Sequence, residues 1–217
     1  MKNNSKKYLY LSITAFVFFI LWTTAVSFVD VQPIGPQQSE VGFAAINGFF
    51  HKLTGVHMWF YTVTDLLSLV PAVFIAGFGT LGLMQLIKRK NILKVDYSIL
   101  VLGGFYIAVM AVYIFFEIFT INYRPVLIDG VLETSYPSST TLLVLCVMPT
   151  AALQIKERLK NAVAKKYSVL AIYIFTAFMV MGRIVSGVHW ITDIIGGILL
   201  STSLVAMYCY INRLNKN

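Results

Sequence analysis

The sequence predicts an all-α integral membrane protein, a bundle of six transmembrane helices with an amphipathic segment on its outer face. Of its 217 residues, 58% are hydrophobic and only 12% are charged, whereas soluble domains contain about 25% charged residues. The mean hydropathy is +0.78. This length suits one compact bundle, so we expect residues 1–217 to form a single integral membrane domain.

Six apolar runs are long enough to cross a bilayer, which takes about 20 helical residues. We expect the spans at residues 8–29, 59–87, 98–121, 140–155, 167–184 and 188–211. The first run is longer than the apolar core of a signal peptide, so we interpret it as an uncleaved span. Glycines in the second and sixth spans are expected to allow close helix contacts. They are Gly77, Gly79, Gly82, Gly196 and Gly197.

The basic residues predict how the bundle is oriented. All but three of the 17 Lys and Arg residues lie before the first span, after the second, between the fourth and fifth, or after the sixth. The positive-inside rule therefore places both termini in the cytoplasm. The three exceptions are Lys52, Arg124 and Arg183. The net charge of +8 is thus explained by topology, and we expect no nucleic-acid partner.

The first outer connection contains the predicted amphipathic segment. It begins with a Pro- and Gly-rich turn, VQPIGPQQS, and continues into a helical pattern. The spacing of Phe43, Ile46, Phe50 and Leu53 is that of one helix face. We expect this helix to lie in the outer interface or to cap the bundle.

The second outer connection, residues 122–141, has the features of an anion site. Arg124 is followed by a proline directly after the third span, which ends the helix there. YPSSTTLL then indicates a new helix with Ser138 or Ser139 as its N-cap. The first turn of a helix has unpaired N–H groups and a partial positive charge, so we expect it to bind an anion.

The stretch GRIVSGVHWITD places charge in an otherwise apolar region. His189 and Asp193 are four residues apart, so on a helix they lie on one face. A charge inside a bilayer costs about 2.5 to 3.5 kcal/mol on insertion scales, which argues against a purely structural role. Arg124, Arg183, a helix start and this His–Asp pair indicate a phosphate site with a nucleophile. We expect Asp65, at the outer end of the second span, to cap a helix, to pair with one of these arginines or to face water, and we assign it no catalytic role from the sequence.

The chain thus holds three ordered blocks: Arg124-Pro125, Pro137-Ser138 and Arg183-x5-His189-x3-Asp193. They resemble the motifs of the type 2 phosphatidic acid phosphatase family, and the resemblance covers residues 117–197. It extends in fold to soluble vanadium haloperoxidases, whose chemistry the membrane composition disfavours. The resemblance implies a lipid phosphate phosphatase that needs no cofactor and no metal. No cluster of His, Cys and carboxylate residues in the sequence suggests a metal site.

The resemblance also implies a role for each matched residue. His189 is expected to attack phosphorus and become a phosphohistidine, while Asp193 holds its other ring nitrogen. Arg124 and Arg183 are expected to clamp the phosphoryl oxygens. The helix start is expected to complete the phosphate pocket through Ser138, Ser139 and Thr140.

Three positions depart from the family pattern. Glu117 replaces a usual Lys, Ser139 replaces a Gly, and Thr140 replaces the His that protonates the leaving oxygen. Three interpretations follow. In the first, the substrate is a diphosphate lipid such as polyprenyl (for example undecaprenyl) diphosphate, whose leaving group needs no proton. In the second, Glu117 supplies the proton. In the third, the chain is a weak or inactive relative that binds lipid phosphate or a partner protein.

We therefore expect a multi-pass protein of the cell membrane with its active site on the outer face. A lipid phosphate substrate and membrane lipids are its expected partners. The sequence leaves the oligomeric state open.

Overall fold

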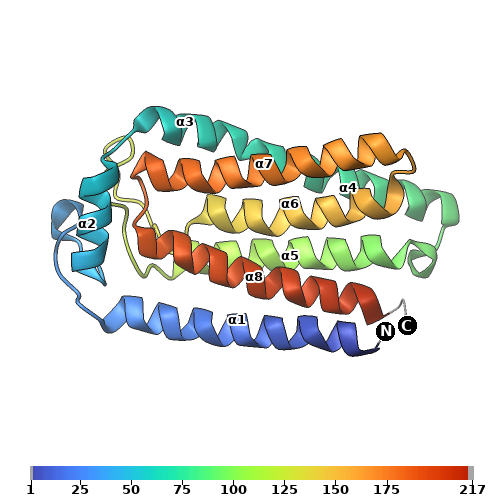
Figure 1. Cartoon of the computed structure of the whole chain (residues 1–217), viewed down its shortest axis with the longest axis horizontal. Coiled ribbons are helices and arrows are strands. Elements are labelled where there is room, and N and C mark those ends of the chain that lie inside the picture. The colour runs from blue at the N-terminus through green and yellow to red at the C-terminus, as the bar shows by residue number, and fades with distance from the viewer. Residues whose placement is uncertain (1, 215–217) are drawn as a thin grey trace.

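The protein is a bundle of long helices, shown in Figure 1 as a computed structural model that describes residues 2–214 and the side chains of residues 5–214. Six spans in this part of the chain are long and apolar enough to cross a membrane. They are α1 (Lys2–Phe28), α3 with α4 (Met58–Leu67 and Leu69–Arg89), α5 (Tyr97–Ile118), α6 (Ser139–Arg158), α7 (Ala162–Ser186) and α8 (Ile191–Leu214). The shorter elements are η1 (Pro36–Gln38), α2 (Ala44–Thr54) and η2 (Ile92–Lys94).

The six expected spans are confirmed, but several of their boundaries are corrected, among them the start of the fifth, which is Ala162 instead of residue 167, and the end of the fourth, which is Arg158 instead of residue 155. The second span is divided at Ser68, because Pro71 has no N–H to continue the hydrogen-bond ladder of the helix. The third span ends at Ile118 instead of residue 121, because the chain from Asn122 onward pairs with residues 133–135. The sixth begins at Ile191, which places residues 188–190 in the turn before it.

The helices are arranged around α6, which is the most deeply buried of the six spans. It packs against α4, α5, α7 and α8, while α1 lies along α8 (Figure 1). Both ends of the chain lie at one end of the bundle, and α2 lies across the other end (Figure 1). Two of the basic residues used to predict orientation, Lys2 and Lys216, lie outside the described side chains.

A polar cluster ties three helices together at the end that holds the termini. Asp96, in the turn before α5, forms ion pairs of 2.9 Å with Arg89 of α4 and 2.9 Å with Arg158 of α6. Gln85 also donates a hydrogen bond to this carboxylate. The hydrogen bond from Arg158 is the main reason why the pKa of Asp96 falls from 3.8 to about 2. The carboxylate therefore stays ionised and keeps α4, α5 and α6 in register.

At the opposite end, α2 confirms the predicted amphipathic helix. Ile46, Phe50 and Leu53 of the predicted face are exposed, whereas Asn47 is fully buried. Phe43 is corrected: it lies before the helix, and its ring stacks on Trp22 of α1. The Asn47 amide donates to Thr192 Oγ1 over 3.0 Å and accepts from the Thr192 amide over 3.3 Å. Through these bonds α2 caps the first turn of α8.

The connection between α5 and α6 is a β-hairpin, residues 122–135. Ile128 and Val131 exchange backbone hydrogen bonds of 3.1 and 2.8 Å across a two-residue turn. The turn residues, Asp129 and Gly130, both have positive φ, at 49° and 78°. This is the geometry of a type I′ turn, which matches the twist of paired strands. The hairpin is a defined structural element that carries side chains into the bundle end.

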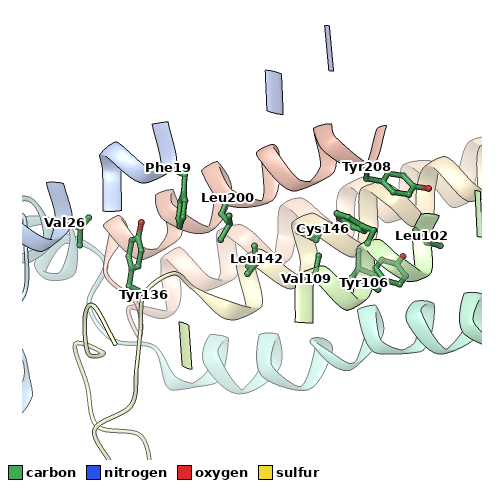
Figure 2. Close-up of a cluster of buried hydrophobic side chains, with 12 residues drawn as sticks. Phe19, Val26, Leu102, Tyr106, Val109, Tyr136, Leu142, Cys146, Leu200 and Tyr208 are labelled. Carbon is green, nitrogen blue, oxygen red and sulfur yellow. The ribbon is translucent and has the colours of Figure 1, made fainter. Parts of the chain in front are cut away.

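Tyr136 anchors the end of this hairpin in the hydrophobic core (Figure 2). Its ring stacks on Phe19 of α1 at 6.4 Å, and its hydroxyl lies 2.7 Å from Thr23 Oγ1. The ring also lies against Gly196 of α8, where an added Cβ would come within 2.6 Å of it. The close contact expected at Gly196 is therefore confirmed.

The expected contacts at the other glycines have mixed outcomes. A Cβ at Gly197 would lie 3.2 Å from Thr141, and one at Gly82 would lie 3.0 Å from Ile99, so both glycines allow close approach. At Gly77 and Gly79 a Cβ would meet nothing within 4 Å. The prediction for these two was wrong, because α4 turns their face away from the neighbouring helices.

We expect Gly196→Ala to destabilise the fold by about 1–3 kcal/mol, since it overpacks a buried ring that has no room to move. Thermal unfolding in detergent measures the effect. Gly77→Ala is the matched control, because its added methyl group enters open space. Equal unfolding temperatures for the two variants would contradict the packing described here.

Candidate active site

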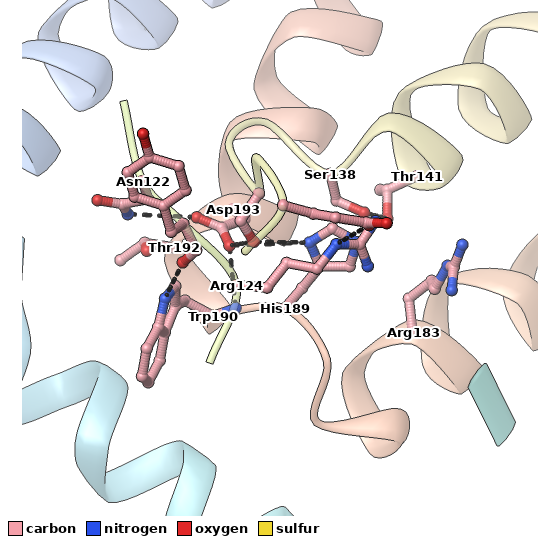
Figure 3. Close-up of polar contacts among 12 residues, drawn as sticks. Asn122, Arg124, Ser138, Thr141, Arg183, His189, Trp190, Thr192 and Asp193 are labelled. Carbon is pink, nitrogen blue, oxygen red and sulfur yellow. Dashed lines mark hydrogen bonds and ion pairs between the residues drawn. The ribbon is translucent and has the colours of Figure 1, made fainter. Parts of the chain in front are cut away.

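The predicted site residues meet at the end of the bundle opposite the termini (Figure 3). Arg124 comes from the hairpin, Arg183 from the last turn of α7, His189 from the turn after it, and Asp193 from the first turn of α8. Their exposed fractions are only 8%, 1%, 6% and 0%, respectively. A group of titratable side chains is thus held out of water at this end.

His189 lies in the α7–α8 turn, so the expected stacking of His189 and Asp193 on one helix face is corrected. Helix α7 ends at Gly187, whose φ of 65° is the left-handed conformation that favours glycine. Asp193 then begins α8 by accepting a 3.0 Å hydrogen bond from the Trp190 amide. Asp193 is the third residue of the helix and Trp190 is the N-cap residue, so this hydrogen bond is one half of a capping box. It fixes the helix start at Ile191 and leaves His189 outside the helix.

Ser135 stands between His189 and Asp193. Its hydroxyl lies 2.9 Å from His189 Nδ1 and makes a short hydrogen bond to Asp193 Oδ2. The direct distance from Nδ1 to Oδ2 is 3.8 Å, beyond hydrogen-bond length. The carboxylate therefore holds the imidazole through a serine, where a direct contact was expected. Asn122 Nδ2 donates to the other oxygen, Oδ1, over 3.4 Å.

The surrounding donors determine which ring nitrogen of His189 carries the proton. Arg124 Nη1 lies 3.4 Å from Nε2, and because a guanidinium has only donors, Nε2 must be the acceptor. The proton is then on Nδ1, which donates to the Ser135 hydroxyl, and that hydroxyl donates to Asp193. Burial lowers the pKa of His189 well below 6.5, and the charges of Arg124 and Arg183 lower it further. The ring is therefore neutral at neutral pH, with the lone pair of Nε2 directed toward Arg124.

Arg183 has more hydrogen-bond donors than the protein satisfies. Its Nη2 donates to Thr140 Oγ1 and, over 3.3 Å, to Asp65 Oδ1, which confirms the expected pairing of Asp65. Its Nε and Nη1 are buried and have no hydrogen-bond partner among the described residues. Unsatisfied buried donors on a charged group are costly, so their presence indicates a site for an anion.

Arg124 and Arg183 approach the same aromatic ring. The carbon at the centre of the Arg124 guanidinium lies 5.8 Å from the centroid of Tyr61, and that of Arg183 lies 5.1 Å from it. Arg124 Nε also forms a 3.0 Å ion pair with Glu133 across the hairpin. Two cations brought to one ring of α3 make a strongly positive environment that suits a phosphate group.

Only some of the groups predicted to form the anion pocket at the start of α6 are available to a ligand. Ser138 is the N-cap residue, but its side chain makes no capping hydrogen bond and instead accepts from Thr141. Its amide donates to the Asp193 carbonyl over 3.1 Å, so it joins the starts of α6 and α8 and is not open to a ligand. The amides of Ser139 and Thr140 follow in the first turn, where no carbonyl of the same helix is available to them.

Glu117 lines a small pocket together with Ser135 and Ser139, at the end of α5 next to the hairpin. Its side chain is exposed, and its carboxylate accepts a 3.0 Å hydrogen bond from Thr134 of the hairpin. Neither Arg124 nor His189 is among its hydrogen-bond partners in the described structure.

A cavity of about 230 Å³ extends from the site along the membrane-spanning helices. Its polar lining residues include Asp65, Ser68, Ser139 and Thr140. Its walls are side chains of α4, α5 and α6, most of them apolar, which include Ile75, Val109, Met110, Leu142, Leu143 and Val147. Such a cavity suits a ligand with a charged head and an apolar chain. The described residues contain no group of three metal-binding side chains.

Comparison with known proteins identifies the family of the chain and a solved structure with the same fold. The family model of the PAP2 superfamily matches residues 104–216. A crystal structure of the first transmembrane PAP2-type phosphatidylglycerolphosphate phosphatase from Bacillus subtilis has a TM-score of 0.58 and 19% sequence identity. The alignment covers 92% of this chain and 94% of that one, and it shows that the two share a fold. Among curated proteins, no sequence matches the chain.

We expect inorganic phosphate to raise the unfolding temperature of the protein, since a ligand that binds only the folded state stabilises it by about 2.7 kcal/mol at 100 times its Kd. Arg183→Gln should remove this increase. Arg158→Gln is the matched control, because it removes an arginine at the opposite end of the bundle. If both variants respond to phosphate like the wild type, the anion site is not at Arg183.

Proposed function

The chain belongs to the PAP2 superfamily, and from this premise we propose that it is a membrane lipid phosphatase that acts through a phosphohistidine on His189. The observation that carries the proposal is the meeting of a neutral, buried His189 Nε2 with the guanidinium of Arg124, beside an Arg183 with two unpaired donors. A nucleophile and an anion site in contact are what phosphoryl transfer requires.

In the first step, the lone pair of Nε2 attacks phosphorus, the N–P bond forms, and the bond to the leaving oxygen breaks with its electron pair on that oxygen. The ring becomes cationic, and its Nδ1–H remains bonded to Ser135 and, through it, to Asp193. Buried negative charge at this position stabilises the imidazolium, as in catalytic triads. Arg124 and Arg183 neutralise the phosphoryl oxygens in the transition state.

We propose a diphosphate lipid, such as a polyprenyl diphosphate, as the substrate. An aliphatic hydroxyl such as that of Thr140 is too weak an acid to serve, and the Glu117 carboxylate is hydrogen-bonded to Thr134 of the hairpin, so we propose that no side chain protonates the leaving oxygen. An alkoxide leaving group has a conjugate acid with a pKa of about 16, whereas a phosphate monoester has one of about 6. Only the second departs readily without an acid. The apolar cavity next to Thr140 supports a lipid chain on the leaving group.

The proposed reaction takes place at the outer leaflet. The described basic residues between α4 and α5 and between α6 and α7 lie at the end of the bundle opposite to His189 (Figure 1). The positive-inside rule assigns that basic end to the cytoplasm, and the site is then on the other face.

The test is phosphate release by the purified protein from polyprenyl diphosphate, phosphatidate and phosphatidylglycerol phosphate. We expect the diphosphate to be the best substrate and His189→Ala to abolish release. Asp193→Asn should lower turnover by about 10⁴-fold, the effect of losing the orienting carboxylate in a triad. His57→Ala, which changes an exposed histidine, is the matched control. A folded wild type that releases no phosphate from any of the three would instead support a lipid-phosphate-binding relative.

Because the proposed mechanism has no general acid for the leaving oxygen, we expect Thr140→His to gain activity on phosphate monoesters. An imidazole at this position should raise monoester turnover by about 10²–10⁴-fold, the usual effect of a positioned general acid. Diphosphate turnover should change far less, because its leaving group is already a stable anion. The double variant Ser139→Gly with Thr140→His gives the ring more room and should be assayed in parallel. If Glu117→Gln lowers monoester hydrolysis, Glu117 is the acid and the proposed substrate preference is wrong.

A further inference from the structure

We propose that Asp65 is the general base of the second half-reaction, in which water hydrolyses the phosphohistidine. This proposal rests on the proposed function and adds to it a catalytic residue from α3. Asp65 lies outside residues 104–216, the part of the chain that matches the family model.

Asp65 lies on the side of the site from which the leaving group departs. Its Oδ1 is 3.3 Å from Arg183 Nη2, the same nitrogen that donates to Thr140 Oγ1. Asp65, Ser139 and Thr140 all line the cavity, where the lipid chain of the substrate is proposed to lie. The carboxylate is therefore next to the junction between the phosphoryl group and the lipid.

Displacement at phosphorus is in line, so the second step uses the same direction of approach. Water must attack opposite Nε2, at the position that the leaving oxygen occupied, and a base must stand at that position. Asp65 is the carboxylate that lines the cavity beside Thr140, where the leaving group is proposed to depart. Its Oδ1 is held by Arg183, while Oδ2 makes no hydrogen bond in the described structure and is free to accept a proton from water.

The atoms of this step balance. The water oxygen forms a bond to phosphorus, and one of its protons passes to Asp65 Oδ2. The P–N bond breaks, its electron pair returns to Nε2, and the cationic ring becomes neutral with its proton still on Nδ1. Inorganic phosphate leaves with the second water proton, and Asp65 then loses its proton to solvent through its exposed side.

The position of Asp65 is fixed by tight packing of α3 on α7. Thr64 is fully buried against Gly182, where an added Cβ would lie 2.6 Å from Thr64 Cγ2. At the start of α3, the His57 amide donates to the Ser186 carbonyl over 2.9 Å. Helix α3 is therefore held on both sides of Tyr61, and its next turn presents Asp65 to Arg183.

The other carboxylates near the site are less suited to this role. Glu133 pairs with Arg124 Nε and does not line the cavity. Asp193 is fully buried behind Ser135, on the far side of the imidazole from Nε2. Glu117 is bonded to the hairpin. Glu133 offers a matched control, since it is also a carboxylate paired with a site arginine.

The experiment follows the phosphoenzyme in time, using polyprenyl diphosphate labelled in its terminal phosphate and quenching in alkali, where phosphohistidine persists. In Asp65→Asn we expect the label to reach His189 at nearly the wild-type rate and to leave at least about 10²-fold more slowly. The result is a burst of one polyprenyl phosphate per enzyme. In Glu133→Gln we expect a higher KM and no accumulation of label.

A second variant tests the same step without the side-chain amide that Asp65→Asn introduces. In Asp65→Ala, added formate should accelerate loss of the label, because a small carboxylate can occupy the position of the missing base. The increase in unfolding temperature with inorganic phosphate verifies that each variant is folded.

Three outcomes would overturn the assignment. If Asp65 only positions Arg183, both variants form the phosphoenzyme slowly, accumulate no label and do not respond to formate. If Asp65→Asn turns over like the wild type, the carboxylate has no role in the reaction. A wild type that never labels His189 overturns the proposed function as well, which distinguishes the failure of the whole mechanism from the failure of this step.

Discussion

The burial of two guanidinium groups at one end of an apolar bundle is the constraint on which the rest of this end depends. A charge removed from water must be paired or hydrogen-bonded, or the fold is destabilised by several kcal/mol. Arg124 is met by the hairpin and the α7–α8 turn, and Arg183 by α3 and α6. Tyr61 lies against both. Segments far apart in the sequence converge because each supplies a partner, and the donors left over on Arg183 mark the proposed anion site.

Composition and motif order were enough to predict the class of fold, the six spans, the capping helix and the family. They were enough because lipid imposes a simple rule, that every span must be a long apolar helix. The meeting of Arg124, Arg183 and His189 also followed from the sequence, since all three stand at the same end of their spans. Orientation across the membrane and the role of each site residue stay predictions.

The features that were not predicted depend on tertiary contacts or on sequence signals that were not used. The hairpin had a readable signal, because Asp129-Gly130 between apolar residues is typical of a type I′ turn. No sequence signal distinguished Ser135. Several residues of TSYPSSTT carry a hydroxyl group, and only the fold shows which of these groups reaches His189. The division at Ser68 follows from Pro71, but the direction of α3 depends on how Thr64 packs on Gly182.

The cavity between α4, α5 and α6 has a consequence for how lipids of different length are treated. Its walls are mostly apolar and belong to membrane-spanning helices, so the proposed substrate, with its head at Thr140, would keep its tail in a hydrocarbon environment throughout. In binding from water, each buried methylene contributes about 0.8 kcal/mol. In transfer from a bilayer to such a cavity, that contribution nearly vanishes. Selectivity among the proposed lipid substrates would then depend on the phosphate head, and lipids with short and long tails would compete on nearly equal terms. The affinity for such a lipid is properly expressed as its mole fraction in the membrane.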